Sequence, residues 1–373
     1  MTSHYTSPLL QIDGATELPD SDAPLLPEHR GVAWHYGDPL VEQRRLDERP
    51  GWIDRSHRRV LRVSGPDAPV FLNNLLSQKL DDVPPGFASP ALDLDMQGHI
   101  LHHLDVLRAH DTDTGDPTFL IHVPAGQEES LRTFLQRMIF WSKVEITPAD
   151  LGVLTLLGEG SHALLRSVLD DARTRTELVG APIDWRGRER ADLLLARAEL
   201  PALIRLLEER GAGRAGLMAF TAERVRALEP ELGVDLDHRS IPHEVPHWIG
   251  RGSHPGAVHL HKGCYRGQET VARVENLGRS PRVAVLLLLD GSAPTEPHAG
   301  EAILRGQRAV GRLGTVVHDS DYGPIAFALL KRSALGQPGL HVGDTAVAVD
   351  PDSLPRDEGE RAGRAAVNRL RGR

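Results

Sequence analysis

The sequence is poor in cysteine, lysine and tyrosine: its 373 residues include one cysteine, four lysines and four tyrosines. A single cysteine excludes an internal disulfide, and it cannot alone hold an iron–sulfur cluster, which usually needs about four thiolates. This scarcity fits a reducing compartment, so we expect a cytoplasmic protein. No apolar run approaches the ~20 residues that span a bilayer, and the polar N-terminus lacks the features of a secretory signal. We therefore expect no membrane partner.

Positive charge is scarcer than negative charge. The formal net charge is −9 at pH 7, which is unfavourable for a generally basic surface. We therefore expect no direct binding of nucleic acid, with contact through an arginine-rich C-terminal tail as the alternative. With 40% hydrophobic and 25% charged residues, the chain has the composition of a globular protein of two or three domains.

Hydrophobic patterning divides the chain into five segments. Residues 1–30 lack periodicity and are predicted to form a disordered arm. Strands and helices then alternate, which is typical of α+β units, whereas short apolar strands after residue 281 indicate a small antiparallel barrel or sandwich. The predicted boundaries are a first α+β region over 31–148, a second over 149–280, a β-barrel over 281–352 and an Arg-rich tail over 353–373.

Individual elements are predicted from their hydrophobic periods of 2 and 3.6 residues. Helices are expected over 70–76, 131–138, 163–169, 201–209 and 267–277. Strands are expected over 58–64, 91–94, 100–107, 119–123, 143–147, 152–157, 191–196, 283–289, 301–304, 310–317 and 325–330.

The sequence motif G-x-G-x-x-G occurs at residues 211–216. A dinucleotide site needs a strand before these glycines, so that they turn the chain into a helix beneath the pyrophosphate. Here residues 203–210 have the pattern of an amphipathic helix, and Gly211 fits its C-terminal stop. We therefore reject a nucleotide site.

Five histidines lie within the 21 residues before Cys264. A zinc site usually needs three or four convergent ligands, but Pro242 and Pro246 would interrupt a helix through this segment. Surface or loop histidines are the simpler interpretation, so we expect no metal site. The histidines are His243, His247, His254, His259 and His261.

The single cysteine, Cys264, lies just ahead of a predicted helix and between Lys262 and Arg266. A helix N-terminus and neighbouring cations both favour the thiolate and raise its reactivity. The alternative is a buried cysteine that acts as a small hydrophobe, which the flanking charges make less favourable. We therefore predict an accessible, functional thiol at Cys264.

Residues 262–269 match the signature K-G-C-Y-x-G-Q-E. The chain thereby resembles the YgfZ branch of the YgfZ/GcvT-like folate-binding family, whose relatives include the glycine-cleavage T-protein and a mitochondrial iron–sulfur assembly factor. Further similarity at residues 36–44, 54–58, 63–68 and 241–244 extends it from about residue 31 to about residue 350. The resemblance implies that Cys264 is the catalytic residue, supported by Lys262, Gly263, Tyr265, Arg266, Gly267, Gln268 and Glu269.

The resemblance implies a GcvT-like α+β fold. Two ferredoxin-like α+β parts would surround a central cavity, followed by a C-terminal antiparallel β-barrel. The cavity would bind tetrahydrofolate or a derivative. The implied role is assembly or maintenance of iron–sulfur proteins, linked to tRNA modification, with iron–sulfur client or assembly proteins as partners.

The chain departs from the aminomethyltransferase pattern at His102 and His103. The T-protein has paired aspartates here, one of which acts in aminomethyl transfer. A neutral imidazole lacks the fixed negative charge of a carboxylate, and Asp105 would share the strand face of His103 without replacing it. We therefore expect that the chain is not a true aminomethyltransferase.

A second departure lies at Arg226, where the family often has a glutamate. That carboxylate can accept paired hydrogen bonds from the pteridine edge, whereas an arginine only donates. Three alternatives stay open: Glu229 takes over after a local shift, the ligand differs, or folate binds through its glutamate tail. The candidate folate-binding residues are Arg226, Glu229, Glu244 and His103.

Three functions therefore compete. The leading hypothesis is a folate-binding-like protein that supports iron–sulfur proteins through Cys264. The alternatives are a folate-dependent aminomethyl or other one-carbon transferase, and an interaction scaffold without a ligand.

Overall fold

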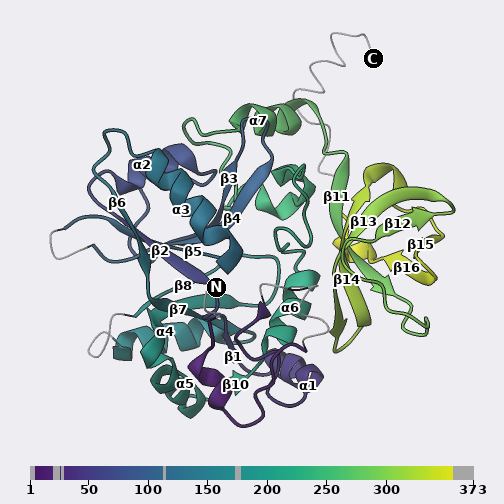
Figure 1. Ribbon diagram of the computed structural model, residues 1–373, viewed down its shortest axis with the longest axis horizontal. Coiled ribbons are helices and arrows are strands. Elements are labelled where there is room, and N and C mark those ends of the chain that lie inside the picture. The colour runs from purple at the N-terminus through teal and green to yellow at the C-terminus, as the bar shows by residue number, and fades with distance from the viewer. Residues whose placement is uncertain (1–4, 20–25, 27–28, 112–114, 173–177, 356–373) are drawn as a thin grey trace.

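The computed structural model describes residues 5–19, 26, 29–111, 115–172 and 178–355. Two α+β layers and a β-barrel make up the fold, and a common core lies between the first of these layers and the barrel (Figure 1). The expected α+β fold with a C-terminal antiparallel barrel is confirmed. Within these described ranges, no helix is both long enough and apolar enough to cross a membrane.

The first α+β layer consists of β2 (Arg59–Ser64), α2 (Ala68–Leu75), β3 (Ala88–Leu94), β4 (Ile100–Arg108), β5 (Thr118–Val123), α3 (Glu128–Arg137) and β6 (Glu145–Ala149). Its antiparallel strands have the order β3-β4-β5-β2-β6. Leu131 and Leu135, one turn apart on α3, pack with Leu72 of α2 against Leu61 and Val63 of β2. The helices therefore bury one face of the sheet.

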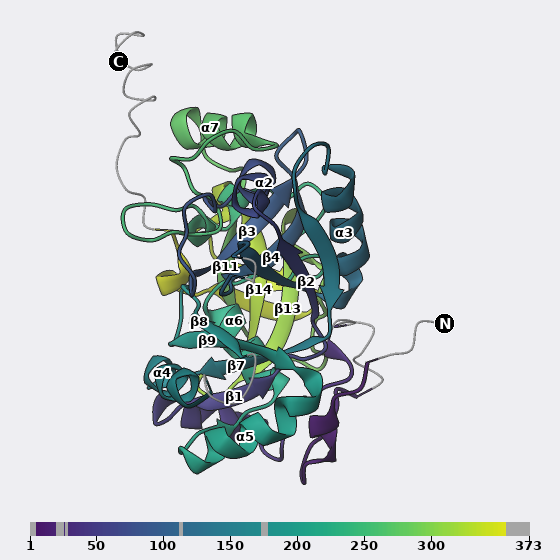
Figure 2. The same cartoon turned by 90° about the vertical axis from the view of Figure 1, so that its left-hand side faces the viewer.

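The second layer consists of α1 (Pro39–Arg44), β1 (Gly51–Asp54), β7 (Leu151–Leu157), α4 (Ser161–Ala172), β8 (Val179–Pro182), β9 (Arg190–Ala196), α5 (Leu200–Glu209) and β10 (Gly213–Arg214). The strand order is β10-β1-β7-β9-β8, and α4 and α5 lie on one side of it (Figure 2). β1 comes from the predicted first region but pairs antiparallel with β7. The two predicted α+β regions are therefore interleaved and are not separated at residue 148.

The barrel consists of β11 (Arg282–Leu289), β12 (Ala302–Arg305), β13 (Arg308–Asp319), β14 (Gly323–Lys331), β15 (Leu340–Val342) and β16 (Thr345–Val349). Pairing of β16 with β11 closes it. Alternation along β11 sends Val283, Val285 and Leu287 into the barrel interior, whereas Ala284 and Leu286 face the common core.

The common core joins the first layer to the barrel. It contains Leu92 of β3, Val225 of α6 (Leu217–Arg226), Val271 of α7 (Gln268–Leu277), Phe327 of β14 and Trp248. Residues from α6 to α7 therefore contribute to the core between the first layer and the barrel.

The prediction of a disordered arm is wrong for residues 5–19. Leu9, on the 3-10 turn η1 (Pro8–Gln11), is buried in the core of the second layer, and the Ser7 hydroxyl donates to the Asp54 carboxylate. One buried leucine on a short turn has no periodicity, so the pattern could not reveal it. Residues 1–4, 20–25 and 27–28 of the predicted arm, and residues 356–373 of the predicted tail, lie outside the described residues.

Candidate functional site

The signature residues 262–269 form the loop that leads into α7, beside the β3–β4 turn (Figure 1). Lys262 fixes its start: its Nζ donates to the backbone oxygens of Asn73 and Leu76 at the end of α2, the latter at 2.5 Å. A cation is favourable at the carbonyl end of a helix. The ammonium also lies 4.7 Å from the centre of the Tyr265 ring, and burial lowers the pKa of Lys262 to about 8.

Arg266 fixes the other side of the loop to the first sheet. Its Nη2 donates to Asp93 Oδ1 of β3 at 2.5 Å, and its guanidinium lies 4.1 Å from the centre of the Phe134 ring of α3. A charge-assisted hydrogen bond combined with a cation–π contact holds both position and orientation. Arg266 therefore connects the loop to both the sheet and its covering helix.

Close backbone packing makes Gly267 necessary. Its φ is +81°, and a Cβ there would lie 2.6 Å from the Asp95 carbonyl oxygen. Gln268 accepts a hydrogen bond from the Tyr265 backbone at 3.3 Å, and Glu269 lies in the first turn of α7. A Cβ on Gly263 would meet no atom within 4 Å, so space alone does not require glycine there.

Cys264 is exposed, between the two anchors of this loop. Lys262 and Arg266 were predicted to provide its electrostatic setting, but their charged groups contact the end of α2 and Asp93. The two cations therefore act on the loop by holding it in place. An exposed thiol held in this way is accessible to a partner as a nucleophile or as a soft metal ligand.

A cavity of about 60 Å³ lies between the two sheets and α6. Its lining comes from both layers and includes His57, Arg58, His103 and Asp105 of the first, Arg190 of the second, and Glu229 after α6. It is separate from Cys264, which does not contribute to its lining.

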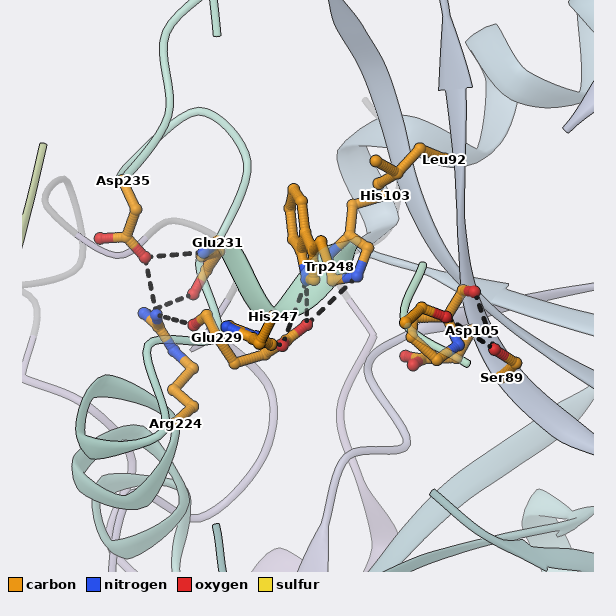
Figure 3. Close-up of polar contacts among 12 residues, drawn as sticks. Ser89, Leu92, His103, Asp105, Arg224, Glu229, Glu231, Asp235, His247 and Trp248 are labelled. Atoms are coloured by element: carbon orange, nitrogen blue, oxygen red, sulfur yellow. Dashed lines mark hydrogen bonds and ion pairs between the residues drawn. The ribbon is translucent and has the colours of Figure 1, made fainter. Parts of the chain in front are cut away.

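Glu229 and His103, both predicted from the sequence, meet beside this cavity (Figure 3). The Glu229 carboxylate accepts hydrogen bonds from His247 Nε2 at 3.0 Å and Trp248 Nε1 at 3.3 Å, and His103 Nε2 lies 3.2 Å away. Burial would raise the pKa of Glu229, but these histidines lower it below its ordinary value. Burial lowers the pKa of His103, so His103 is neutral at pH 7.

Arg224 holds the segment that carries Glu229. Its guanidinium donates to the Glu229 carbonyl at 3.2 Å, Asp235 Oδ2 at 2.7 Å and Glu231 Oε2 at 3.0 Å (Figure 3). Leu228, just before Glu229, has a φ of +58°. A non-glycine residue in this region is strained, and such strain clusters at functional sites. These contacts and the strained turn aim Glu229 at the cavity.

An ion-pair network extends from the cavity wall into the contact between the sheets. Ligand atoms of Asp105, His122 and Asp192 lie within 4.8 Å of one another, close enough to share a metal ion. However, Arg190 Nη2 lies 2.7 Å from Asp192, and Arg58 Nη2 lies 3.4 Å from Asp105. A divalent cation would add uncompensated buried charge beside these guanidiniums. The arrangement is therefore an ion-pair network between the two sheets.

Arg226 and Glu244, two further residues predicted to bind folate, do not line this cavity. Arg226 occupies the last turn of α6 and contacts Asp319 and Asp321 of the barrel at 3.4 and 3.3 Å. Glu244 is buried against Arg282, whose Nε donates to it at 2.8 Å. Both side chains are directed to partners in or beside the barrel.

His102 and His103 separate because neighbours on β4 point to opposite faces. His102 lies 2.8 Å from Asp93 Oδ2 and 2.8 Å from Ser130 Oγ of α3. His103 alone faces the cavity. The predicted pair therefore contributes one imidazole to the central site.

The helix-end interpretation of residues 211–216 agrees with the structure. α5 ends at Glu209, and Gly211 has a φ of +91°. A Cβ on Gly216 would lie 2.2 Å from the Trp34 carbonyl oxygen, so backbone fills the space at the start of α6. This space is unsuited to a pyrophosphate.

The five histidines before Cys264 do not converge. In the part of the chain that the structure describes, they form no group of three potential metal ligands. Their contacts are His243 with Glu275, His247 with Glu229, His254 with Asp184, and His259 with His261.

Several residues in or beside the cavity were not anticipated: Arg58, Arg190 and Glu231 line it, and His247 and Trp248 contact Glu229. Charged residues inside apolar strand patterns were an available signal, because an isolated buried charge is costly and needs a partner. Trp248 gave no such signal, since it lies in a proline-rich loop without periodicity.

Several known proteins are similar to this chain in sequence or in fold. No family model matches the chain. The chain is 28% identical over 306 residues to the tRNA-modifying protein YgfZ of Edwardsiella ictaluri, covering 79% of this chain and 84% of that protein. It is 27% identical over 219 residues to the aminomethyltransferase of Methylococcus capsulatus, covering 56% of this chain and 59% of that protein.

A third relative is the mitochondrial iron–sulfur cluster assembly factor IBA57 homolog of Chaetomium globosum, 27% identical over 281 residues, covering 65% of this chain and 57% of that protein. The crystal structure of aminomethyltransferase T from Bartonella henselae superposes with a TM-score of 0.73 and 18% identity, covering 91% of this chain and 94% of the other. The chain is YgfZ/GcvT-like. The resemblance inferred from the signature is thereby confirmed, and the structural match establishes the fold.

Proposed function

We propose that the chain supports the assembly or maintenance of iron–sulfur proteins, with a link to tRNA modification, and that Cys264 is the thiol it presents to a partner. The observation that carries this proposal is an exposed Cys264 on a loop anchored by Lys262 and Arg266. The names of the YgfZ and IBA57 relatives support the iron–sulfur and tRNA roles. Partners would be iron–sulfur client or assembly proteins in the cytoplasm.

An aminomethyltransferase is the second candidate, favoured by the similarity to named aminomethyltransferases. Against it, the imidazole facing the cavity is the neutral His103, which cannot supply a carboxylate's charge. Asp105 is already paired with Arg58 at 3.4 Å. We expect no methylene-tetrahydrofolate to form from an aminomethylated carrier protein; its formation would establish the transferase.

Tetrahydrofolate is the ligand that the resemblance implies. The cavity offers the Glu229 carboxylate, and among the described residues the buried His29 Nδ1 and His57 Nδ1 have no hydrogen-bond partner. However, a volume of about 60 Å³ is far below the ~300–1,000 Å³ typical of ligand pockets. Binding of tetrahydrofolate here would therefore require the cavity to widen.

Gene deletion tests this function directly. Cells that lack the protein should lose activity of iron–sulfur enzymes and the tRNA modification that depends on one of them, and the wild-type gene should restore both. An unrelated enzyme without a cluster serves as the control and should keep its activity. Unchanged iron–sulfur activity and tRNA modification in the deletion strain would refute the proposal.

A further inference from the structure

Trp248 is a core tryptophan whose indole N–H is directed at a buried carboxylate. It ends the 3-10 turn η7 (Pro246–Trp248), and its side chain is 1% exposed. Its indole Nε1 lies 3.4 and 3.3 Å from the two carboxylate oxygens of Glu229. The indole ring lies 4.6 Å from the imidazole of His103, with the two planes tilted by 47° (Figure 3).

Trp52 is a second buried tryptophan and serves as a comparison. Its side chain is fully buried in the core of the second layer, 5.1 Å from the ring of Tyr36. Its indole Nε1 has no hydrogen-bond partner among the described residues. A buried carboxylate in front of the indole N–H therefore distinguishes Trp248 from Trp52.

The contacts of Trp248 are those that hold a planar heterocyclic ligand in a protein site. Such a ligand is stacked on a side-chain ring and directs an N–H group at a buried acceptor. Glu229 also contacts His247 at 3.0 Å and His103 at 3.2 Å. The donors that a ligand would supply to Glu229 are thus supplied by the chain itself, and only about 60 Å³ remains in the adjacent cavity.

We propose that the Trp248 indole is a built-in occupant of a ring-binding site and takes the place of a planar N–H-bearing heterocycle against Glu229 and His103. Removing the indole opens this site to indole itself and to the larger pteridine ring of a folate. The inference concerns the cavity alone and does not depend on the role proposed for Cys264.

The test compares three full-length proteins: the wild type, Trp248→Ala and Trp52→Ala. Both substitutions remove a buried indole, but only the first leaves a cavity beside a carboxylate. Indole and tetrahydrofolate are the two probes, because an apolar cavity can accept a small aromatic molecule regardless of any polar partner. Thermal unfolding and isothermal titration calorimetry measure stabilisation and affinity.

We expect millimolar indole to raise the Tm of Trp248→Ala by about 2 °C or more and to leave the wild type unchanged. Tetrahydrofolate should bind Trp248→Ala at least tenfold more tightly than it binds the wild type or Trp52→Ala. Adding Glu229→Gln to Trp248→Ala should weaken tetrahydrofolate binding, because the carboxylate that accepts its N–H groups is lost.

Equal affinity of tetrahydrofolate for the wild type and Trp248→Ala would overturn the inference, since the indole would then exclude nothing. Equal affinity of tetrahydrofolate for Trp52→Ala and Trp248→Ala would also overturn it, because the Glu229 carboxylate would then be irrelevant. If Trp248→Ala does not fold alone, Trp248→Leu keeps more of the buried volume and is tested with the same probes. Failure of both probes to stabilise either folded variant would reject a ring-binding site.

Discussion

Replacing Asp192 with asparagine tests whether the buried ion pairs hold the two sheets together. Asp192 lies on β9 and is fully buried. Its carboxylate accepts hydrogen bonds from Thr155 at 2.6 Å and Arg190 at 2.7 Å, with Arg55 at 3.5 Å and His122 Nε2 at 3.3 Å. Burial alone would raise the pKa of Asp192, but Arg190 and Arg55 hold it well below its ordinary value. The side chain is therefore charged at pH 7.

Asp192→Asn keeps the shape of the side chain but leaves two buried guanidiniums without this carboxylate. Removing one partner of a buried ion pair costs about 3–5 kcal/mol, so the free energy of unfolding should fall by about that amount. The matched control is Glu208→Gln, whose partner Arg214 forms an exposed pair worth about 0–1 kcal/mol. Urea unfolding followed by circular dichroism measures both. A loss below about 1 kcal/mol for Asp192→Asn would refute the reasoning.

Two further predictions concern pH and the signature loop. Burial lowers the pKa of His122 to about 4, so the unfolded chain takes up a proton near pH 6.5 that the folded chain resists. The neutral His122 therefore contributes stability of the order of 3 kcal/mol, which is present above pH ~6.5 and lost as the pH falls through about 4. A Tm that does not fall between pH 7 and 4.5 would contradict this prediction. Gly267→Ala should lower the free energy of unfolding by about 1–3 kcal/mol, because Gly267 has a positive φ and lies close to the Asp95 carbonyl. The control variant Gly263→Ala should change it little. Equal urea midpoints for the two variants would argue against the close packing at Gly267.

Much of the fold was predictable because its elements are locally encoded. The helical spacing of apolar residues correctly predicted α3, and a run of apolar residues correctly predicted β11. β1 was missed because four buried residues carry no clear period, and its pairing with β7 joins residues about a hundred positions apart. Such long-range pairing depends on the whole fold and cannot be predicted from the residues of the strand alone.

Only some residues of the candidate site could be predicted from the sequence, and the directions of their side chains could not. Glu229 and His103 meet as the local-shift alternative allowed, whereas the side chain of Arg226 is directed to the barrel. Lys262 and Arg266 are adjacent to Cys264 in sequence, yet their long side chains reach other elements. The sequence fixes the backbone position of such a residue relative to Cys264. Tertiary packing determines which group the charged end of its long side chain contacts.

Rescue of the deletion strain by Cys264→Ala is the decisive measurement. The wild type, Cys264→Ala and the surface control Glu208→Gln are expressed at matched abundance, and the activity of an iron–sulfur enzyme is measured in each strain. A thiol presented to a partner predicts activity near the deletion level with Cys264→Ala and wild-type activity with Glu208→Gln. Full restoration of activity by Cys264→Ala would show that the thiol has no part in the function.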